Sequence, residues 1–184
     1  MYIFTFIFLY LLKKIINILG GNYINSLSSI SFLINIYAPG DTYLDIILIS
    51  LTFVSSIHHS IRHLYRTKFN KFVHCCDSGL IGCLTSYLLL KKLNIYPITL
   101  SFLITNIIII FEYLYNLKIL KKIITALCFM YIIYLNPVFI FYISVALFFF
   151  FNSNKWDQNN IYRYGWHVSS SLCILYYLIN YSNF

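Results

Sequence analysis

The amino-acid sequence predicts an all-α protein, a multi-pass bundle of transmembrane helices with seven spans. Hydrophobic residues make up 60% of the 184 residues and charged residues only 10%, which leaves too little polar surface to cover a soluble globule of this size. The apolar residues fall into runs of roughly 16 to 22 residues, close to the length that crosses a bilayer as a helix. Short polar or basic stretches separate these runs.

The chain begins with an apolar segment, residues 1–21, which Lys13 and Lys14 interrupt. We expect this segment to lie at the membrane interface or to form part of the first span, which runs to about residue 38 and ends at a Pro-Gly-Asp turn. Residues 22–184 are predicted to form one seven-helix membrane domain. Its later spans lie at about 42–61, 73–90, 95–116, 119–135, 137–152 and 162–181.

The distribution of basic residues predicts topology. A net charge of +8 would suit a nucleic-acid partner, but the thirteen Lys and Arg lie in short clusters between apolar runs and form no single basic face, so no nucleic-acid partner is expected. If successive loops alternate sides, one side receives only Lys91 and Lys92. The other side, which is expected to be cytosolic, receives Lys13, Lys14, Arg62, Arg66, Lys68, Lys71, Lys118, Lys121, Lys122 and Lys155.

Ionisable residues occur where the predicted spans meet that basic side. The second span ends at His59, the third carries Asp77 near its start, the fourth carries Glu112 near its end, and the seventh carries His167 near its start. Such residues cost roughly 2.5–3.5 kcal/mol each at mid-bilayer, so they usually face the bundle interior and mark function. We expect His59, Asp77 and His167 to converge on the cytosolic side, with Glu112 as a supporting group.

Helical spacing separates the two neighbouring histidines of the second span. Ser55, His59 and His63 follow one another at intervals of four residues and share one face, whereas His58 points about 100° away. We therefore expect His59 to face the same way as Ser55 and His58 to serve packing.

The third span combines polar and small residues. His74 and Asp77 are neighbours at i and i+3, and His74 is expected at the level of the lipid headgroups because basic loop residues precede it. Gly79 and Gly82 would let another helix approach closely.

Histidine and carboxylate side chains from three helices suit a zinc ion. Catalytic zinc takes three protein ligands and leaves a fourth position for water. The bound ion lowers the pKa of that water to about 7 and polarises a carbonyl group, so an ester or amide can be hydrolysed at neutral pH.

The pattern Ser55-x-x-x-His59, Asp77 early in the next span and a histidine in the last span resembles the CREST superfamily of seven-span proteins. These include alkaline ceramidases, the progestin and adiponectin receptors, GPI-remodelling proteins, and myomaker and its GPI-phospholipase relatives. The stretch Asn25–Leu33, followed by the span that ends in two histidines, is similar to the amino-terminal half of myomaker-type proteins. The passage into the third span is also similar to that of the receptors, through Ser55, Arg66, Phe72, Asp77 and Gly79.

The resemblance implies an intramembrane zinc-dependent hydrolase of a lipid amide or ester bond. Zinc would be held by His59 and His167 with Asp77, membrane lipid would be the substrate, and Ser55 and Asp77 would orient water or stabilise the oxyanion.

The chain departs from the family at one position, because the last-span pattern His-x-x-x-His has Arg163 in its first place. A guanidinium group cannot ligate zinc. In one alternative, His63 supplies the missing ligand from its place four residues after His59. In the other, the metal site is degenerate, Arg163 supports the site by pairing with Asp77, and the protein is a non-catalytic member that acts in membrane remodelling, fusion or lipid sensing. The sequence leaves open whether the chain is an enzyme.

Overall fold

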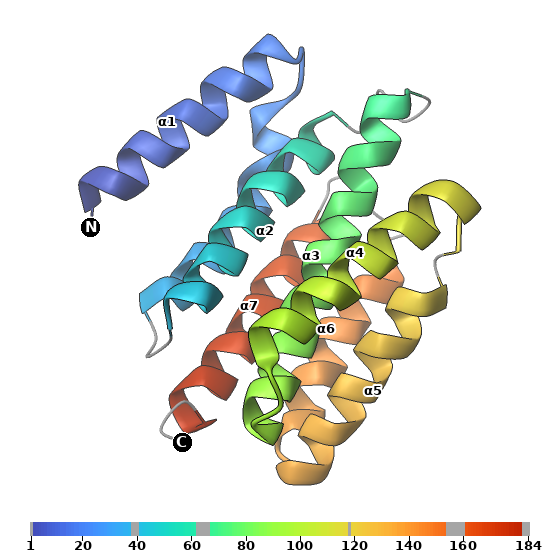
Figure 1. Ribbon diagram of the computed structural model, residues 1–184. Coiled ribbons are helices and arrows are strands. Elements are labelled where there is room, and N and C mark those ends of the chain that lie inside the picture. Colours follow the sequence, from blue (N-terminus) through green and yellow to red (C-terminus); the bar gives the residue numbers. More distant parts are fainter. Residues whose placement is uncertain (1, 38–40, 62–66, 118, 154–160, 182–184) are drawn as a thin grey trace.

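A computed structural model of the chain describes residues 2–37, 41–61, 67–117, 119–153 and 161–181. These residues form helices joined by short connections, and no strand occurs among them (Figure 1). The all-α class predicted from composition is confirmed. In chain order the elements are α1 (Tyr2–Ile18), η1 (Tyr23–Tyr37), α2 (Thr42–Ser60), α3 (Lys68–Leu93), α4 (Pro97–Tyr115), α5 (Ile119–Leu135), α6 (Phe139–Ser153) and α7 (Ile161–Tyr181).

Helices α2 to α7 lie where the apolar runs predict spans, and the largest difference is that α3 begins at Lys68 rather than at residue 73. Of the described helices, α3 and α4 are long and apolar enough to cross a membrane, judged by length and composition. Shorter apolar helices cover Ser26–Ile36, Lys122–Tyr134 and Phe139–Asn152. The division of the chain into residues 1–21 and 22–184 stays a prediction.

The predicted first span is wound as a 3-10 helix, η1, of 15 residues. A 3-10 helix has three residues per turn, and its buried side chains other than Ser28 follow that period in the row Ser26, Ser29, Phe32 and Asn35. This row contacts α2 through Ser29 and α7 through Asn35. Only a three-residue repeat places all four side chains on one face, which accounts for the tighter winding.

Local signals in the sequence set the ends of several helices. Asp41 caps α2 by accepting a hydrogen bond from the Leu44 amide at 2.8 Å, and Thr67 caps α3 in the same way through the Asn70 amide. Helix α3 ends at Leu93 and is capped by Asn94, whose φ of 57° lies in the left-handed region that asparagine tolerates. Pro97 then opens α4, where its missing amide hydrogen is not needed.

Helices α3 and α4 approach closely at the two glycines, as predicted. A Cβ atom on Gly79 would lie 2.5 Å from Cγ1 of Ile109, and one on Gly82 would lie 2.3 Å from Cδ1 of Ile108. Ile108 is buried at this contact. The close approach fixes how the end of α4 lies beside the start of α3.

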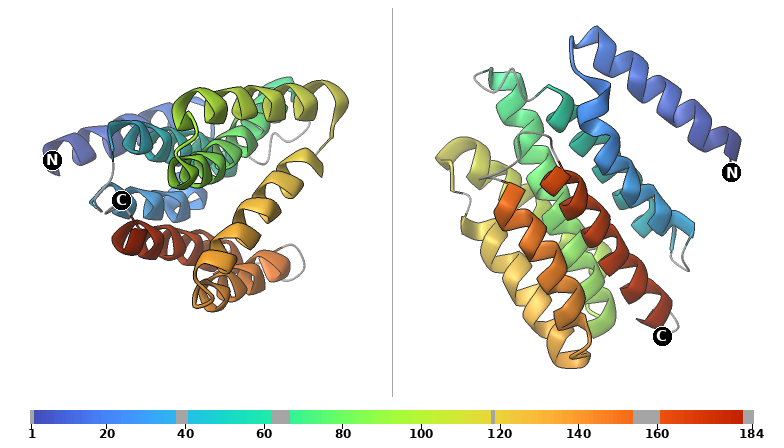
Figure 2. Two further views of the ribbon diagram at one scale, coloured as in Figure 1. Left: turned by 60° about the horizontal axis from the view of Figure 1, so that its bottom comes forward. Right: turned by 180° about the vertical axis from the view of Figure 1, so that it is seen from behind.

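Helix α3 packs against α2, α4 and α5, while α7 packs against α6 and η1 (Figures 1 and 2). Helix α2 also packs against η1, so η1 lies in contact with both α2 and α7. This arrangement brings the end of α2, the start of α3, the end of α4 and the start of α7 to one end of the bundle (Figure 1). The ionisable candidate site residues that the structure describes all come from these four segments, namely His58, His59, His74, Asp77, Glu112 and His167.

Candidate metal centre

Two histidines from helices far apart in the sequence meet at this end of the bundle. The Nε2 atoms of His59 on α2 and His167 on α7 lie 3.1 Å apart, and their ring centroids are 4.8 Å apart. His167 is buried and His59 is half-buried. Of the three residues that were predicted to converge, His59 and His167 thus lie in contact.

The other nitrogen of His167 faces two serines of η1. Its Nδ1 lies 3.2 Å from the hydroxyl oxygen of Ser29 and 3.4 Å from that of Ser28. The Ser29 hydroxyl donates a hydrogen bond in turn to the Ser55 oxygen at 3.2 Å. With its own hydrogen used in this way, Ser29 is placed to accept one from Nδ1–H, which leaves the lone pair of the ring on Nε2. Histidine ligands of metals are usually oriented by such a contact.

Sequence reasoning did not single out Ser28 and Ser29. They lie more than 130 residues from His167 along the chain, in a serine-rich segment that has no metal-ligand spacing. Of the two, only Ser29 belongs to the row of side chains that are buried at every third position, and that row can be recognised only once the segment is known to be a 3-10 helix.

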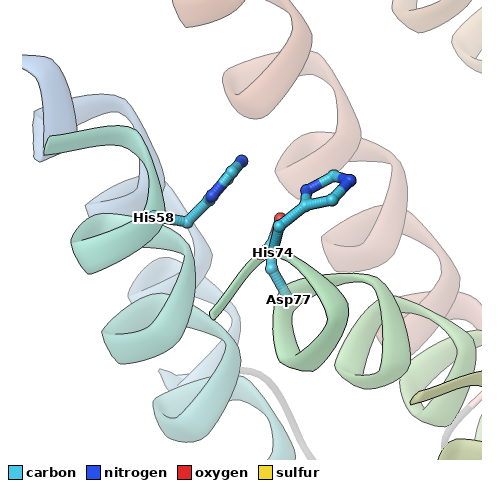
Figure 3. A group of neighbouring side chains, drawn as sticks. All are labelled: His58, His74 and Asp77. Atoms are coloured by element: carbon cyan, nitrogen blue, oxygen red, sulfur yellow. The ribbon is translucent and has the colours of Figure 1, made fainter. Parts of the chain in front are cut away.

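A second group of ligand-type side chains lies beside the first. His58 on α2 and His74 and Asp77 on α3 each offer one ligand atom, and these atoms all lie within 4.8 Å of one another (Figure 3). The rings of His58 and His74 have centroids 4.8 Å apart, and Asp77 is buried. This group could hold a metal ion.

Glu112 reaches this second group from α4. Its carboxylate Oε1 lies 3.2 Å from Nε2 of His74, and its side chain is buried. The Nδ1 atom of His74 is also buried and has no hydrogen-bond partner among the described residues. The close packing of α3 on α4 at the glycines accounts for this contact, because it brings the end of α4 against the start of α3.

The two groups adjoin each other along one cavity. The rings of His58 and His59 have centroids 5.1 Å apart. All five ligand-type residues, together with Glu112 and Ser55, line a cavity of about 1230 Å³. Apolar side chains from α3, α5, α6 and α7 form most of the remaining wall, including Leu84, Phe129, Ile132, Ile143 and Ile174.

The predicted site residues are thus divided between two neighbouring groups. His59 and His167 contact each other, and Ser55 reaches them through Ser29. Asp77 lies instead with His58 and His74, two residues that were predicted to serve packing and to lie among headgroups. Glu112 supports the second group. His63 and the side chain of Arg163 lie outside the described residues, so their predicted roles stay predictions.

Comparison with known proteins finds no matching family model, no matching curated protein and no matching solved structure. Membership of the CREST superfamily therefore stays a prediction, and function has to be inferred from the geometry of the site.

Proposed function

We propose that this chain is a multi-pass membrane protein that uses zinc to hydrolyse a lipid amide or ester bond. The observation that carries the proposal is the pair of Nε2 atoms of His59 and His167, 3.1 Å apart at one end of a large cavity with mostly apolar walls. The predicted resemblance to the CREST superfamily points the same way.

The distribution of polarity supports a membrane location for more helices than α3 and α4. Large apolar side chains face outward on α5 and α6, for example Met130 at 66%, Phe141 at 67% and Phe148 at 57% exposure. Soluble proteins rarely expose so many apolar side chains together, whereas lipid tails would cover them favourably. Polar residues such as Glu112 and Asp77 are buried instead. In its 3-10 form, η1 extends over about 30 Å, close to the thickness of a hydrocarbon core, although it has only 15 residues.

The geometry of the histidine pair suits zinc. Zinc–nitrogen bonds of about 2.0–2.1 Å in a tetrahedral arrangement place two nitrogen ligands roughly 3.3 Å apart. His59 and His167 would hold the ion through Nε2, whereas Asp77, which was predicted as the third ligand, lies with His58 and His74 and faces the same cavity from there. A bound zinc ion would supply an activated water and polarise the scissile carbonyl group. Ser29 and Ser55 would keep His167 in the orientation and tautomer that bind the ion.

The cavity suits a lipid substrate. Its apolar wall can accommodate acyl chains without leaving polar groups unpaired. Lys68, Lys71 and Lys122 line the same cavity, so a phosphate-bearing headgroup would find cations there. Ceramides and phospholipids are therefore the substrates to compare.

The test uses the full chain purified in detergent micelles. Zinc content is measured by atomic emission, and release of fatty acid is measured from ceramide, phosphatidylcholine and phosphatidylglycerol. We expect His59→Ala and His167→Ala to lose zinc. Removing a residue that only orients a metal ligand typically costs roughly 10–100-fold in activity, so loss of a ligand itself should reduce turnover by more than that. Ser169→Ala is the matched control on α7, because the Ser169 hydroxyl donates to the carbonyl of Gly165 in its own helix.

Wild-type protein without zinc, or histidine variants with full turnover, would contradict the proposed mechanism. The non-catalytic alternative predicts a different result, in which the protein binds lipid but releases no fatty acid from any of the three substrates. The departure at Arg163 is the observation that favours this alternative.

A further inference from the structure

The second group of ligand-type residues is distinct from the pair assigned to the hydrolytic zinc. His58 and His59 are consecutive on α2, so their side chains leave the helix about 100° apart. His59 turns toward His167 on α7, whereas His58 turns toward His74 on α3. One helix therefore presents a histidine to each of two partners.

The ligand set of this second group is suited to a divalent transition-metal ion. Two imidazoles and one carboxylate form the three-ligand set of many zinc sites, with one position left open. Imidazole nitrogen is a poor ligand for Mg²⁺ and Ca²⁺, which prefer oxygen, so the set favours ions such as Zn²⁺. The ligand atoms of His58, His74 and Asp77 already lie within 4.8 Å of one another.

The surroundings hold these ligands in place. His74 and Asp77 are i and i+3 neighbours on α3, so a single helix fixes their relative positions. The Oε1 atom of Glu112 lies 3.2 Å from Nε2 of His74, an ion-pair contact rather than an aligned hydrogen bond, and a carboxylate in this place would orient a metal-binding histidine. Nδ1 of His74 has no hydrogen-bond partner among the described residues, so it can face an ion.

We propose that His58, His74 and Asp77 bind a divalent transition-metal ion of their own, beside the His59–His167 pair, and that Glu112 positions His74 for it. The chain would then bind two ions at one end of its cavity. This inference does not depend on hydrolysis, because it concerns a separate set of ligands.

The experiment is a zinc titration of the full chain in detergent micelles after removal of bound metal with a chelator. Calorimetry gives the stoichiometry, and titration with Co²⁺ gives visible absorption bands that report how the bound ion is coordinated. We expect about two Zn²⁺ per wild-type chain and one in His74→Ala and in Asp77→Asn. His167→Ala should also bind one, by losing the other ion, and its Co²⁺ spectrum should differ from that of His74→Ala.

Glu112→Gln tests the site with little disturbance of folding, because glutamine keeps the size of the side chain while removing its charge. We expect it to weaken one of the two sites by about 10–100-fold and to leave the other unchanged. Thr85→Ala is the control, since the Thr85 hydroxyl lines the same cavity but donates to carbonyls of its own helix. It should retain both sites with unchanged affinity.

Two results would overturn the inference. One is a wild-type stoichiometry of one with His74→Ala and Asp77→Asn unaffected. The other is a single ion that the His59, His167, His74 and Asp77 variants all abolish, since that result describes one shared centre. Two bound ions without any lipid hydrolysis would leave the inference standing and contradict the proposed function, so the two failures can be told apart.

Discussion

The contact between η1 and His167 leads to a quantitative prediction. In Ser29→Ala, His167 Nδ1 loses the nearer of its two serine contacts, at 3.2 Å, and keeps the contact with Ser28 at 3.4 Å. Removing a group that orients a metal-bound histidine typically weakens metal affinity 10–100-fold. Since Ser28 can partly replace Ser29, we expect the lower end, about tenfold, which corresponds to about 1.4 kcal/mol. The double variant Ser28→Ala/Ser29→Ala should approach 100-fold, about 2.8 kcal/mol.

The assay is competition between the protein and a coloured zinc chelator, with the free metal concentration varied over several decades. Ser169→Ala removes a hydroxyl two residues from His167 that hydrogen-bonds only within its own helix, so its affinity should equal that of wild type. If the double variant binds zinc within about threefold of wild type, the serines do not orient His167 and the reasoning fails. An equal loss in Ser169→Ala would point to general disturbance of α7.

Three further predictions concern stability, measured as melting temperature in micelles. Gly82→Ala places a methyl group against Cδ1 of Ile108, and this overpacking should cost about 1–3 kcal/mol of stability. The higher helix propensity of alanine offsets up to about 1 kcal/mol of that cost. The double variant Gly82→Ala/Ile108→Val lacks the Cδ1 atom, so it should melt at a higher temperature than Gly82→Ala alone. Asp41 caps α2 and also pairs with Lys91 at 2.6 Å, so Asp41→Ala should cost about 1–2 kcal/mol and Asp41→Asn, which can still cap, distinctly less. Burial works to raise the pKa of the Asp41 carboxyl, but hydrogen bonds from Lys91, Tyr87 and the Leu44 amide outweigh it and hold that pKa below its usual 3.8. A lowered pKa stabilises the folded state at neutral pH and ceases to do so as the pH falls through the lowered value, so the gap between wild type and Asp41→Asn should shrink below about pH 4.

Each stability prediction has a clear contrary result. A double variant that melts no higher than Gly82→Ala would mean that Ile108 is not the obstacle to closer packing. If Asp41→Asn and Asp41→Ala melt together, the cap contributes nothing measurable. If the difference in melting temperature between wild type and Asp41→Asn stays the same at low pH, the ion pair does not cause that difference.

The sequence predicted the helices well because each depends on local information. Apolar runs set their positions, and signals such as Asp41 and Pro97 set their ends. The winding of η1 was not predicted, because a short apolar run with serines fits an α-helix equally well. Its geometry depends on which side chains α2 and α7 present to it, and that is tertiary information.

The candidate site was predicted in outline for a similar reason. Helical periodicity correctly placed His58 and His59 on different faces of α2. It could not show that α3 lies opposite His58 and α7 opposite His59, so His58 was assigned to packing. His74 was placed among headgroups because of its basic neighbours, but the close approach of α4 brings Glu112 to it.

The three-residue repeat of η1 restricts how its sequence can change. Ser29 contacts His167 and Asn35 donates a hydrogen bond to Ser171 at 2.9 Å, two turns apart on the same 3-10 face. Inserting or deleting one residue between them would rotate one contact about 120° from the other. Only an insertion or deletion of three residues would keep both side chains on the same face of η1, and even that would change the distance between the two contacts along α7. The length of this segment is therefore fixed by its two polar contacts, whereas its outward apolar positions, such as Leu27 and Ile34, are free to exchange with other apolar residues.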